Sequence, residues 1–462
     1  MKFHITTFGC QMNVHDSQWL TRALESRGWQ EASQDEALVY IFNTCSVREK
    51  PEQKVYSEIG RIAAHVRRDP RVFVAVGGCV AQQIGWGFFE RFPFVRLVFG
   101  SDGIAGAPNA LERIVAGSDE RAALLDFMPA YEEREVALEQ SAGSAAGSSA
   151  GAGRQAFVTI MQGCDNFCAY CIVPYTRGRQ KSRHPDAVVD ECRALVASGV
   201  REITLLGQNV NSFGMDKGGA GVTFAQLLRQ VAAIKGLDRL RFTTSHPKDI
   251  APEVIAAFGE FETLCPSLHL PLQSGSDAML KAMRRRYTLD HYMGIVEALK
   301  QARPDIVLTT DLIVGFPGET EADFQATLDA IQTVGYDSSF SFKYSDRPGV
   351  AAVNMEPKVD PEVAAERLMR LQTLQNSITR KCLKMLVGTK TDVFVEGLSR
   401  IQGRDVPSWK GRDPAGRVVN VRMGNGCMGN GDAGELVGMM VPVRITEAKK
   451  YTLMGEGTGT PW

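Results

Sequence analysis

Three cysteines lie close together near the middle of the chain, in the run Gly163-Cys164-Asp165-Asn166-Phe167-Cys168-Ala169-Tyr170-Cys171. Their C-x3-C-x2-C spacing begins just after a stretch that predicts a β-strand. Three thiolates so spaced can each bind one iron of a cubane [4Fe-4S] cluster and leave its fourth iron without a protein ligand. Such an open iron suits chelation of S-adenosylmethionine (SAM) through its amino and carboxylate groups.

A zinc site is the main alternative for this run. Structural zinc usually takes four ligands from paired C-x2–4-C segments, and no second pair is evident nearby in the sequence. The bacterial ferredoxin run also differs, because it adds a fourth cysteine followed by proline. The spacing therefore favours a cluster with one open iron over zinc or a chance arrangement.

Three further cysteines are far apart in the sequence but share a context. Cys10, Cys45 and Cys79 each follow shortly after a predicted strand. The C-terminal ends of the strands of an open parallel sheet meet at one edge, where ligands usually bind, so these thiols could converge on a second cluster. A lone cysteine is more often a small buried hydrophobe, and the spacing alone leaves both interpretations open.

The first part of the chain alternates short apolar strands with amphipathic helices. Strands are predicted at residues 3–7, 38–42, 72–76 and 96–99, and helical periodicity covers residues 17–27 and 54–67. This alternation predicts an α/β domain built on an open parallel sheet. We place this domain at residues 1–117.

The alternation resumes in the centre of the chain and runs longer. Strands are predicted to begin near residues 157, 202, 239, 267, 306 and 338, with helices at 187–197, 224–234, 252–258, 289–301 and 322–334. Successive βα units of this kind predict a (βα)6 partial barrel whose site lies at the C-terminal ends of its strands. A helix over residues 361–385 closes this domain, which we place at residues 150–382.

Two other segments have a distinct composition. Residues 141–153 contain only Ser, Ala and Gly, which cannot bury a core, so we predict a flexible linker over residues 132–153. Residues 384–448 are rich in glycine and β-favouring stretches and predict a small antiparallel β-barrel. Within them, residues 424–434 (GNGCMGNGDAG) are unusually rich in glycine.

The bulk composition excludes several classes of protein. Because 52 basic side chains nearly balance 53 acidic ones, any surface that binds nucleic acid must be local. No apolar run approaches the roughly 18–20 residues that span a bilayer, and the start of the chain shows no signal peptide. The ten cysteines are therefore expected to be reduced, and we expect a cytoplasmic protein with no membrane contact.

The cysteine run and its position at the first strand of a βα series resemble the radical-SAM superfamily. The resemblance implies that SAM is a cofactor and that Tyr170 lies against its adenine. The other SAM contacts that it implies are Gly207, Gln208, Gln273, Ser274 and Gly315. A tight βα turn would also explain a glycine at position 207.

The chain further resembles the methylthiotransferases over nearly its whole length. The segments that carry this similarity are residues 9–13 (GCQMN), 43–50 (NTCSVREK), 78–81 (GCVA), 174–179 (PYTRGR), 205–211 (LLGQNVN), 269–275 (HLPLQSG) and 315–320 (GFPGET). That family combines a radical-SAM core with a C-terminal RNA-binding barrel called TRAM. Membership implies two [4Fe-4S] clusters, the second held by Cys10, Cys45 and Cys79.

Within that family, residues 11–13 (QMN) and 46–50 (SVREK) resemble the branch that acts on tRNA isopentenyladenosine. The resemblance implies methylthiolation of carbon 2 of isopentenyladenosine at position 37, beside the anticodon. SAM would be both radical source and methyl donor, and the second cluster would carry the sulfur. The implied partners are the tRNA anticodon loop and an electron donor such as flavodoxin or ferredoxin, and a monomer is expected.

Other functions remain to be weighed. The same chemistry could act on a ribosomal-protein aspartate or on threonylcarbamoyladenosine of tRNA. A different class is a non-catalytic RNA-binding redox sensor with iron–sulfur clusters, although sensing does not need an open iron.

Some conspicuous residues receive no role in the chemistry. His246 and His269 are as well explained by structure as by metal binding. The arginines at 284–286 are expected on a solvated face, where they could contact tRNA phosphate. The cysteines expected not to bind metal are Cys192, Cys265, Cys382 and Cys427.

Overall fold

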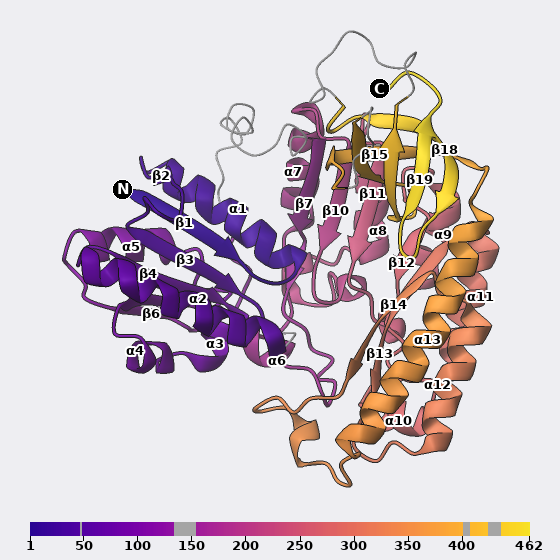
Figure 1. Cartoon of the computed structure of the whole chain (residues 1–462), viewed down its shortest axis with the longest axis horizontal. Helices are drawn as coiled ribbons and strands as arrows, with labels where there is room; N and C mark the ends of the chain where they lie inside the picture. The colour runs from indigo at the N-terminus through magenta and orange to yellow at the C-terminus, as the bar shows by residue number, and fades with distance from the viewer. Residues whose placement is uncertain (47–48, 134–153, 401–406, 424–435) are drawn as a thin grey trace.

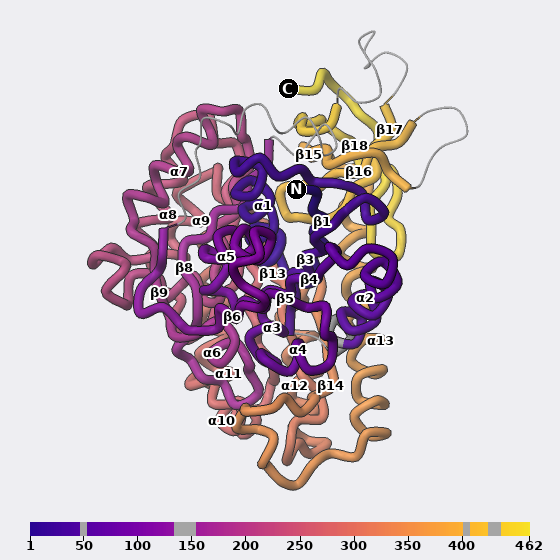
Figure 2. The backbone as a smooth tube through the Cα atoms, turned by 90° about the vertical axis from the view of Figure 1, so that its left-hand side faces the viewer, coloured from indigo at the N-terminus to yellow at the C-terminus, as the bar shows by residue number. Residues whose placement is uncertain are grey.

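The computed structural model describes residues 1–46, 49–133, 154–400, 407–423 and 436–462. Three units follow one another along the chain: an N-terminal sheet, a central partial barrel and a C-terminal closed barrel (Figure 1). Seen from the side of the N-terminal unit, the sheet lies in front and the closed barrel lies above (Figure 2). The predicted α/β architecture of three units is confirmed.

The N-terminal unit is a six-stranded sheet in the order β2-β1-β3-β4-β5-β6, and its neighbouring strands are all parallel. The strands are β1 (Lys2–Thr7), β2 (Gln30–Glu31), β3 (Val39–Thr44), β4 (Phe73–Gly78), β5 (Val95–Phe99) and β6 (Ala122–Leu124). The helices are α1 (Gln11–Glu25), α2 (Glu49–Arg68), α3 (Cys79–Ile84), α4 (Gly87–Arg91) and α5 (Ala107–Val115).

Helices cover both faces of this sheet. Val39 and Ile41 of β3 pack in one cluster with side chains of α1 and α5, whereas Tyr40 and Phe42 pack in another with side chains of α2, α3 and α4. Because both faces are covered, β3 and β4 are buried along their whole length, as is typical of parallel sheets. The strands β1, β3 and β4 are neighbours, so their C-terminal ends share one edge.

The partial barrel of the central unit is built from two parallel three-stranded sheets, β7-β10-β11 and β12-β13-β14, and a short antiparallel pair, β8 (Met161–Gln162) with β9 (Lys181–Ser182), lies beside it in the chain. The strands are β7 (Gln155–Thr159), β10 (Glu202–Leu206), β11 (Arg239–Thr243), β12 (Ser267–His269), β13 (Val307–Val314) and β14 (Ser338–Lys343). A parallel bridge between Leu240 and Leu264 joins the two sheets. Within the described residues, β7 and β14 pair on one side only, so the predicted partial barrel is open between them.

The main helices of this unit are α7 (Pro185–Ala197), α8 (Phe224–Ala232), α9 (Pro252–Glu260), α11 (Leu289–Ala302) and α12 (Glu321–Val334). They pack with the strands around one large apolar core. The long helix α13 (Pro361–Met385) starts at Asp360, whose carboxylate accepts hydrogen bonds from the first turn. It lies along β14 (Figure 1), and its Gln375 and Thr379 bind the carbonyls of Tyr336 and Asp337 just before that strand.

The C-terminal unit is a closed barrel in the order β15-β16-β17-β19-β18. Its strands are β15 (Lys390–Leu398), β16 (Ser408–Arg412), β17 (Val418–Arg422), β18 (Met440–Ala448) and β19 (Leu453–Gly457). Trp409 is fully buried in its core among valines. The prediction of an antiparallel barrel needs one correction, because β17 and β19 are parallel while the other pairs are antiparallel.

Two predicted domain limits stop short of the units that the structure contains. The sheet of the first unit includes β6, which lies beyond residue 117, and the closed barrel includes β19, which lies beyond residue 448. β6 is a short edge strand and β19 is a short strand that closes the barrel. Neither shows a clear alternation of apolar and polar residues, which explains why the sequence pattern did not predict them. The predicted linker at 132–153 lies almost entirely outside the described residues, as does the glycine-rich segment at 424–434.

Buried arginines join the closed barrel to the central unit. Arg239 and Arg241 of β11 donate to the backbone carbonyls of Asp392, Arg412 and Asp413 at 2.6–3.1 Å.

No helix in the described part of the chain is long and apolar enough to cross a bilayer.

Candidate active site

The first cysteine triplet occupies the loop that follows β7 and the short strand β8 (Met161–Gln162) and precedes the short helix α6 (Val173–Thr176). Gly163 opens this loop with φ of +77°, and a Cβ there would stand 2.1 Å from the carbonyl oxygen of Arg179. Only glycine fits such a position. The loop is closed by a hydrogen bond from the Cys171 amide to the Cys168 carbonyl, at 2.9 Å.

The three thiols of this loop lie close enough for their charges to affect one another. Burial, together with the nearby Cys168, raises the pKa of Cys164 to about 11 and that of Cys171 to about 12. In the described chain, no three His, Cys, Asp or Glu side chains lie close enough to grip one metal ion. A cubane needs a wider spacing, because each of its thiolates binds a different iron. The donor set of three soft thiols therefore fits a cluster.

Two positively polarised groups lie against the Cys168 sulfur. Arg285 Nη1 is 3.3 Å from Cys168 Sγ, and His246 Nε2 is 3.9 Å from it. Burial, together with Arg285 and Lys248, lowers the pKa of His246 well below its ordinary value, so its ring is neutral. The structure thus corrects the prediction that residues 284–286 form a solvated face, since Arg285 is only 4% exposed.

Of the SAM contacts implied by resemblance, Tyr170 lies in this loop and Gln208 is hydrogen-bonded to it. The Tyr170 hydroxyl is 3.4 Å from Arg285 Nη1. Gln208 Oε1 accepts a hydrogen bond from the Gly163 amide at 2.5 Å, so the turn after β10 is tied directly to the cysteine loop. A Cβ on Gly207 would stand 2.6 Å from Met161 Cγ, and close packing alone is enough to explain this glycine.

Gln273 and Ser274 lie between β12 and the short helix α10 (Asp277–Ala282). Gln273 has φ of +73°, and its amide donates to the Asp311 carbonyl of β13 at 2.9 Å. Ser274 is fully buried, and its hydroxyl lies 3.3 Å from that of Thr327 in α12. The Ser274 side chain is therefore engaged within the fold.

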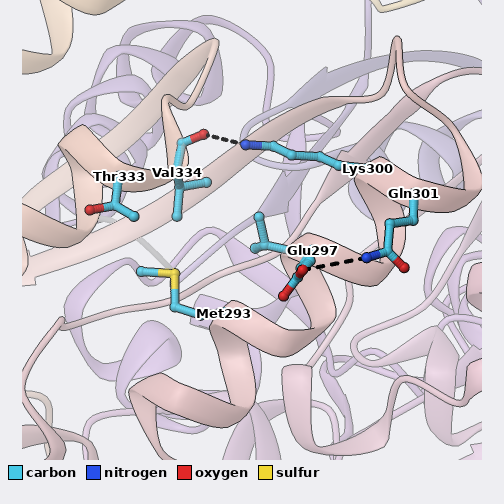
Figure 3. A pocket seen from close by; sticks show the side chains of 7 residues that line it. Met293, Glu297, Lys300, Gln301, Thr333 and Val334 are labelled. Atoms are coloured by element: carbon cyan, nitrogen blue, oxygen red, sulfur yellow. Dashed lines mark hydrogen bonds between the residues drawn. The ribbon is translucent and has the colours of Figure 1, made fainter.

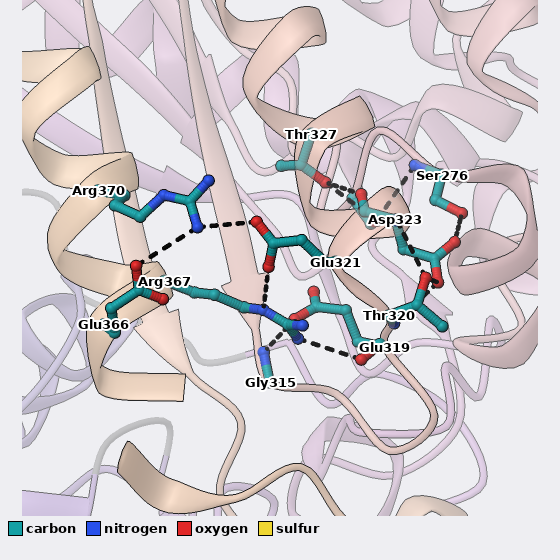
Figure 4. Close-up of polar contacts among 11 residues, drawn as sticks. Ser276, Gly315, Glu319, Thr320, Glu321, Asp323, Thr327, Glu366, Arg367 and Arg370 are labelled. Atoms are coloured by element: carbon teal, nitrogen blue, oxygen red, sulfur yellow. Dashed lines mark hydrogen bonds and ion pairs between the residues drawn. The ribbon is translucent and has the colours of Figure 1, made fainter. Parts of the chain in front are cut away.

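Gly315 follows β13 and is held from two sides. Its amide donates to Glu319 Oε2 at 2.7 Å, and the same oxygen accepts from Arg367 Nη1 of α13 at 2.8 Å (Figure 4). A Cβ on Gly315 would stand 2.6 Å from the Ala364 Cβ of α13. Burial raises the pKa of Glu319 despite the hydrogen bonds from Gly315 and Arg367.

The second cysteine triplet lies at the C-terminal edge of the N-terminal sheet, as predicted from strand order. Cys45 and Cys79 are 3% exposed, whereas Cys10 is open to solvent. A Cβ on Gly9 would stand 2.3 Å from Cys45 Cβ, so the chain before Cys10 runs directly against Cys45. A hydrogen bond from Cys45 and the charge of Arg177 lower the pKa of Cys10 to about 5.

Arg177 comes from the central unit yet lies among the residues of this triplet. It is 3% exposed, donates to Asn13 Oδ1 at 3.1 Å and approaches Asp16 Oδ2 at 3.7 Å. Burial alone would lower its pKa, but Cys79, Asp16 and Cys10 hold that pKa above its ordinary value. The sequence pattern assigns Arg177 no role. The only indication in the sequence is that Arg177 lies within residues 174–179 (PYTRGR), which resemble the methylthiotransferases.

A second buried charge joins the same two units. Asp102, which follows β5, pairs with Lys181 and accepts from Gln162, and the paired side chains are 6% and 5% exposed. His15 of α1 hydrogen-bonds Thr159 of β7 at 3.1 Å. The two cysteine triplets therefore lie on units that are joined by buried polar contacts.

Polar and aromatic side chains line the interior of the partial barrel. Along β13, Thr309 and Asp311 are half-buried while Leu308, Thr310 and Leu312 are buried, so alternate residues face inward. His269 Nδ1 lies 2.9 Å from Thr309 Oγ1, and its Nε2 lies 3.3 Å from Asp311 Oδ2. The Phe340 ring, 55% exposed, meets His269 edge-on at 6.3 Å.

A surface hollow of about 450 Å³ lies between α11 and α12, away from the cysteines (Figure 3). Met293, Glu297, Lys300, Gln301, Thr333 and Val334 line it, and Lys300 Nζ donates to the Val334 carbonyl. Because α12 ends at Val334 just before β14 begins, this hollow lies at the N-terminal ends of the strands. Ligand chemistry in such barrels is located at the opposite end.

Two family models match the chain. The radical SAM superfamily matches residues 158–331, and the Uncharacterized protein family UPF0004 matches residues 2–100. The first includes the Cys164, Cys168 and Cys171 loop, and the second includes Cys10, Cys45 and Cys79.

Curated relatives match from end to end. The tRNA-2-methylthio-N(6)-dimethylallyladenosine synthase of Nitratidesulfovibrio vulgaris is 59% identical over 460 residues, which cover 100% of this chain and 99% of the relative. The synthases of Oleidesulfovibrio alaskensis and Lawsonia intracellularis are 54% and 52% identical, with 98% or more of both chains covered.

Solved structures resemble the fold at low identity. A radical S-adenosylmethionine methyltransferase, TsrM, from Kitasatospora setae, solved with cobalamin and a [4Fe-4S] cluster, superposes with a TM-score of 0.54 at 17% identity. The match covers 76% of this chain and 74% of that one. It supports the shared architecture of a sheet domain joined to a partial barrel.

Proposed function

The chain belongs to the tRNA-2-methylthio-N(6)-dimethylallyladenosine synthases, and on this premise we propose that its two cysteine triplets hold two [4Fe-4S] clusters that serve one reaction. It is a radical SAM tRNA methylthiotransferase. We assign Cys164, Cys168 and Cys171 to the core cluster and Cys10, Cys45 and Cys79 to the second. The substrate is tRNA, and the specific target we propose is carbon 2 of isopentenyladenosine at position 37.

One observation carries this proposal. Three thiols in the loop that follows β7 and β8, and three at the C-terminal ends of β1, β3 and β4, lie on two units that Arg177 and Asp102 join through buried contacts. A redox sensor would not need two triplets on units that are joined in this way. Sulfur transfer does need them near each other, because the reacting groups must meet.

The residues present suit both groups. When bound, the core cluster would supply the electron that cleaves SAM to methionine and a deoxyadenosyl radical. The second cluster would supply the sulfur that is transferred to the base. The chain's own contribution is to bury part of each set of ligands. Cys45, Cys79 and Cys168 are all less than 9% exposed, which protects radical chemistry from competing donors.

SAM binding is assigned to the loops that meet the core cysteines. Tyr170 lies on the cysteine loop itself. Gly207 and Gln208 lie in the turn that is hydrogen-bonded to this loop, and the Gln273 amide is hydrogen-bonded to β13. Gly315 has its amide fixed by Glu319. Ser274 contributes through its backbone, since its hydroxyl is engaged with Thr327.

The tRNA base is assigned to the interior of the partial barrel. Phe340 offers an exposed aromatic face on which a base can stack, worth about 1–3 kcal/mol. Asp311 and His269 offer hydrogen-bonding groups beside it. Anticodon-loop bases can be splayed out of their stack into such a pocket. The closed C-terminal barrel is assigned to RNA binding as a TRAM domain.

The remaining partners follow from this reaction. Each cycle consumes an electron, so a low-potential donor such as flavodoxin or ferredoxin is required. We propose a cytoplasmic monomer, because tRNA modification occurs where tRNA is made and used.

The test is to assay a variant in which Cys10, Cys45 and Cys79 are all replaced by Ala. Anaerobically reconstituted variant should lose about four irons per chain, the content of one cubane. It should still form deoxyadenosine from SAM but make no methylthio product. Wild-type iron content or full product formation would show that these cysteines are buried thiols without a cluster.

The substrate is tested in parallel with wild-type enzyme. Mass spectrometry of nucleosides should find the methylthio group only on tRNA that already carries isopentenyladenosine. Equal turnover on tRNA without the isopentenyl group, on threonylcarbamoyladenosine or on a ribosomal-protein aspartate would reject the proposed target. Each of these outcomes would leave the cluster assignment intact.

A further inference from the structure

Cys168 differs from the other two core cysteines in its surroundings. Two side chains from distant parts of the central unit point hydrogen-bond donors at its sulfur: Arg285 through Nη1 at 3.3 Å and His246 through Nε2 at 3.9 Å. All three side chains are buried, with exposed fractions of 8%, 4% and 5%. Such contacts do not arise from a flexible surface side chain.

The position of Arg285 is fixed by its other hydrogen bonds. Nη2 donates to the Pro271 carbonyl at 3.0 Å, and Nε donates to the Tyr287 hydroxyl at 3.2 Å. The adjoining backbone is tied to the cysteine loop as well, since the Ala169 amide donates to the Met283 carbonyl at 2.9 Å. The guanidinium is therefore held with Nη1 toward Cys168.

The proton of His246 can be located from its contacts. Nδ1 accepts a hydrogen bond from the Lys248 amide at 3.2 Å, so Nδ1 carries no hydrogen. In the neutral ring the hydrogen then resides on Nε2, which is the atom that faces Cys168. The ring is kept in place by an edge-on contact with Tyr287 at 5.7 Å.

We propose that Arg285 and His246 are positioning residues that donate hydrogen bonds to the Cys168 thiolate and thereby make the core cluster easier to reduce. The inference rests on the proposed role of Cys168 as a ligand. Hydrogen bonds to cluster sulfurs are among the factors that set the reduction potential. Groups around the ligands tune a metal centre in the same way.

The sign of the effect follows from charge. Reduction adds a negative charge that is shared with the ligand sulfurs. A donor on a sulfur stabilises the more negative, reduced form most, so removing a donor should move the midpoint potential to a more negative value. Cleavage of SAM by a weak reductant should then slow more than cleavage by a strong one.

The experiment compares Arg285→Met, Arg285→Lys, His246→Phe and His246→Gln in the full-length reconstituted protein. Met at position 285 and Phe at position 246 keep much of the side-chain volume but remove the hydrogen-bond donor. Lys at position 285 and Gln at position 246 keep a hydrogen-bond donor. The midpoint potential is measured by redox titration with electron paramagnetic resonance, and the core cluster is identified as the signal that changes when SAM is added. Arg284→Met is the matched control, because Arg284 is an exposed neighbour that loses the same charge.

Arg285→Met and His246→Phe should each shift the core potential to a more negative value at unchanged iron content, and Lys or Gln should restore part of the shift. Arg284→Met should leave the potential unchanged. Equal potentials in all folded variants would overturn the inference, and so would a shift in Arg284→Met as large as in Arg285→Met. If Arg285→Met does not fold, the potentials of His246→Phe and His246→Gln test the inference instead. If Cys168→Ala retains the core signal, the ligand assignment fails instead.

Discussion

At the scale of single residues, the two cysteine triplets are positioned by what surrounds them. Gly163 and Gly9 allow the chain to pass where a Cβ would collide with Arg179 or Cys45. Arg177 and Arg285 each bring a buried positive charge to one triplet. An uncompensated buried charge is costly. Asp16 offsets part of the Arg177 charge, and a cysteine that binds iron as a thiolate would offset the charge of Arg285.

Replacing one core ligand should abolish radical chemistry. Cys168→Ala should lower iron content by about four atoms per chain and eliminate deoxyadenosine formation, because a cubane with two protein ligands is poorly held. Cys192→Ala is the control, since Cys192 is buried in the apolar core of α7 and the same atom is removed there. Iron assays and chromatography of deoxyadenosine provide the measurement. Undiminished cleavage in Cys168→Ala would refute the assignment.

The sequence predicted the cysteines but not their arginines, for a physical reason. Cysteine spacing and strand order are local or nearly local properties, and they placed Cys10, Cys45 and Cys79 at one sheet edge. Whether an arginine is buried depends on partners far away in the sequence. The Arg285 partner Cys168 is 117 positions distant, and Arg284 and Arg286, its neighbours, are exposed.

At the scale of elements, the βα alternation was sufficient to predict the strands of the central unit. All six strands of the two parallel sheets begin within two residues of the predicted position, and β10, which is buried along its whole length, has the clear apolar run of a buried parallel strand. The short strands β6 and β19 and the parallel pairing of β17 with β19 were missed. Which strand closes a barrel is decided by packing over the whole unit, and a strand of three or five residues carries little pattern.

Helix α13 has a role at this scale that its amphipathic pattern did not reveal. Its Arg367 is 6% exposed and pairs with Glu319, which is 1% exposed and fixes the Gly315 amide. Arg370, one turn later, pairs with the more exposed Glu321 (Figure 4). The helix thereby holds the loop after β13 in place.

Arg367→Met should destabilise the protein by about 3–5 kcal/mol, because it leaves the Glu319 charge buried and unpaired. Arg370→Met is the control and should cost about 0–1 kcal/mol, since that pair is partly exposed. The double variant Arg367→Met/Glu319→Gln should recover much of the loss. Urea unfolding of the three variants measures these differences, and equal midpoints for Arg367→Met and Arg370→Met would contradict the explanation.

The same variant should respond to pH. The folded-state pKa of Glu319 is already above its ordinary value of 4.5 because of burial, and loss of Arg367 should raise it further. A carboxyl with a raised pKa binds its proton more tightly in the folded state, so stability rises as pH falls from the raised value toward 4.5. Arg367→Met should therefore regain stability, relative to wild type, as pH falls toward 4.5, which urea unfolding at a series of pH values measures.

At the scale of the whole molecule, buried charges join all three units. Arg239 and Arg241 attach the closed barrel to the central unit, and the contacts of Asp102 and Arg177 attach the N-terminal sheet. Interfaces between domains are often more polar than domain cores. Here the polar contacts fix how the two units that carry the cysteine triplets are oriented relative to each other. A purely apolar interface would define that orientation less specifically.

Loosening one of these contacts should separate the two halves of the reaction. In Asp102→Asn, Lys181 remains buried without its counter-charge, at a cost of about 3 kcal/mol or more. If half of that cost falls on the docking of the N-terminal unit, the equilibrium constant for docking falls about tenfold, which sets the largest decrease in the docked fraction. Formation of deoxyadenosine depends on the central unit alone and should persist, while methylthio product per deoxyadenosine should fall by up to that factor.

Two further variants make this result specific to the interface. Asp102→Asn/Lys181→Met removes both charges and should restore much of the product ratio, because an apolar replacement avoids the unpaired charge. Asp119→Asn removes a carboxylate from an ion pair with the exposed Arg113 in the same unit and should leave the ratio unchanged. Both products are quantified from one reaction by mass spectrometry. A product ratio in Asp102→Asn equal to that of wild type would show that the buried pair does not couple the two units.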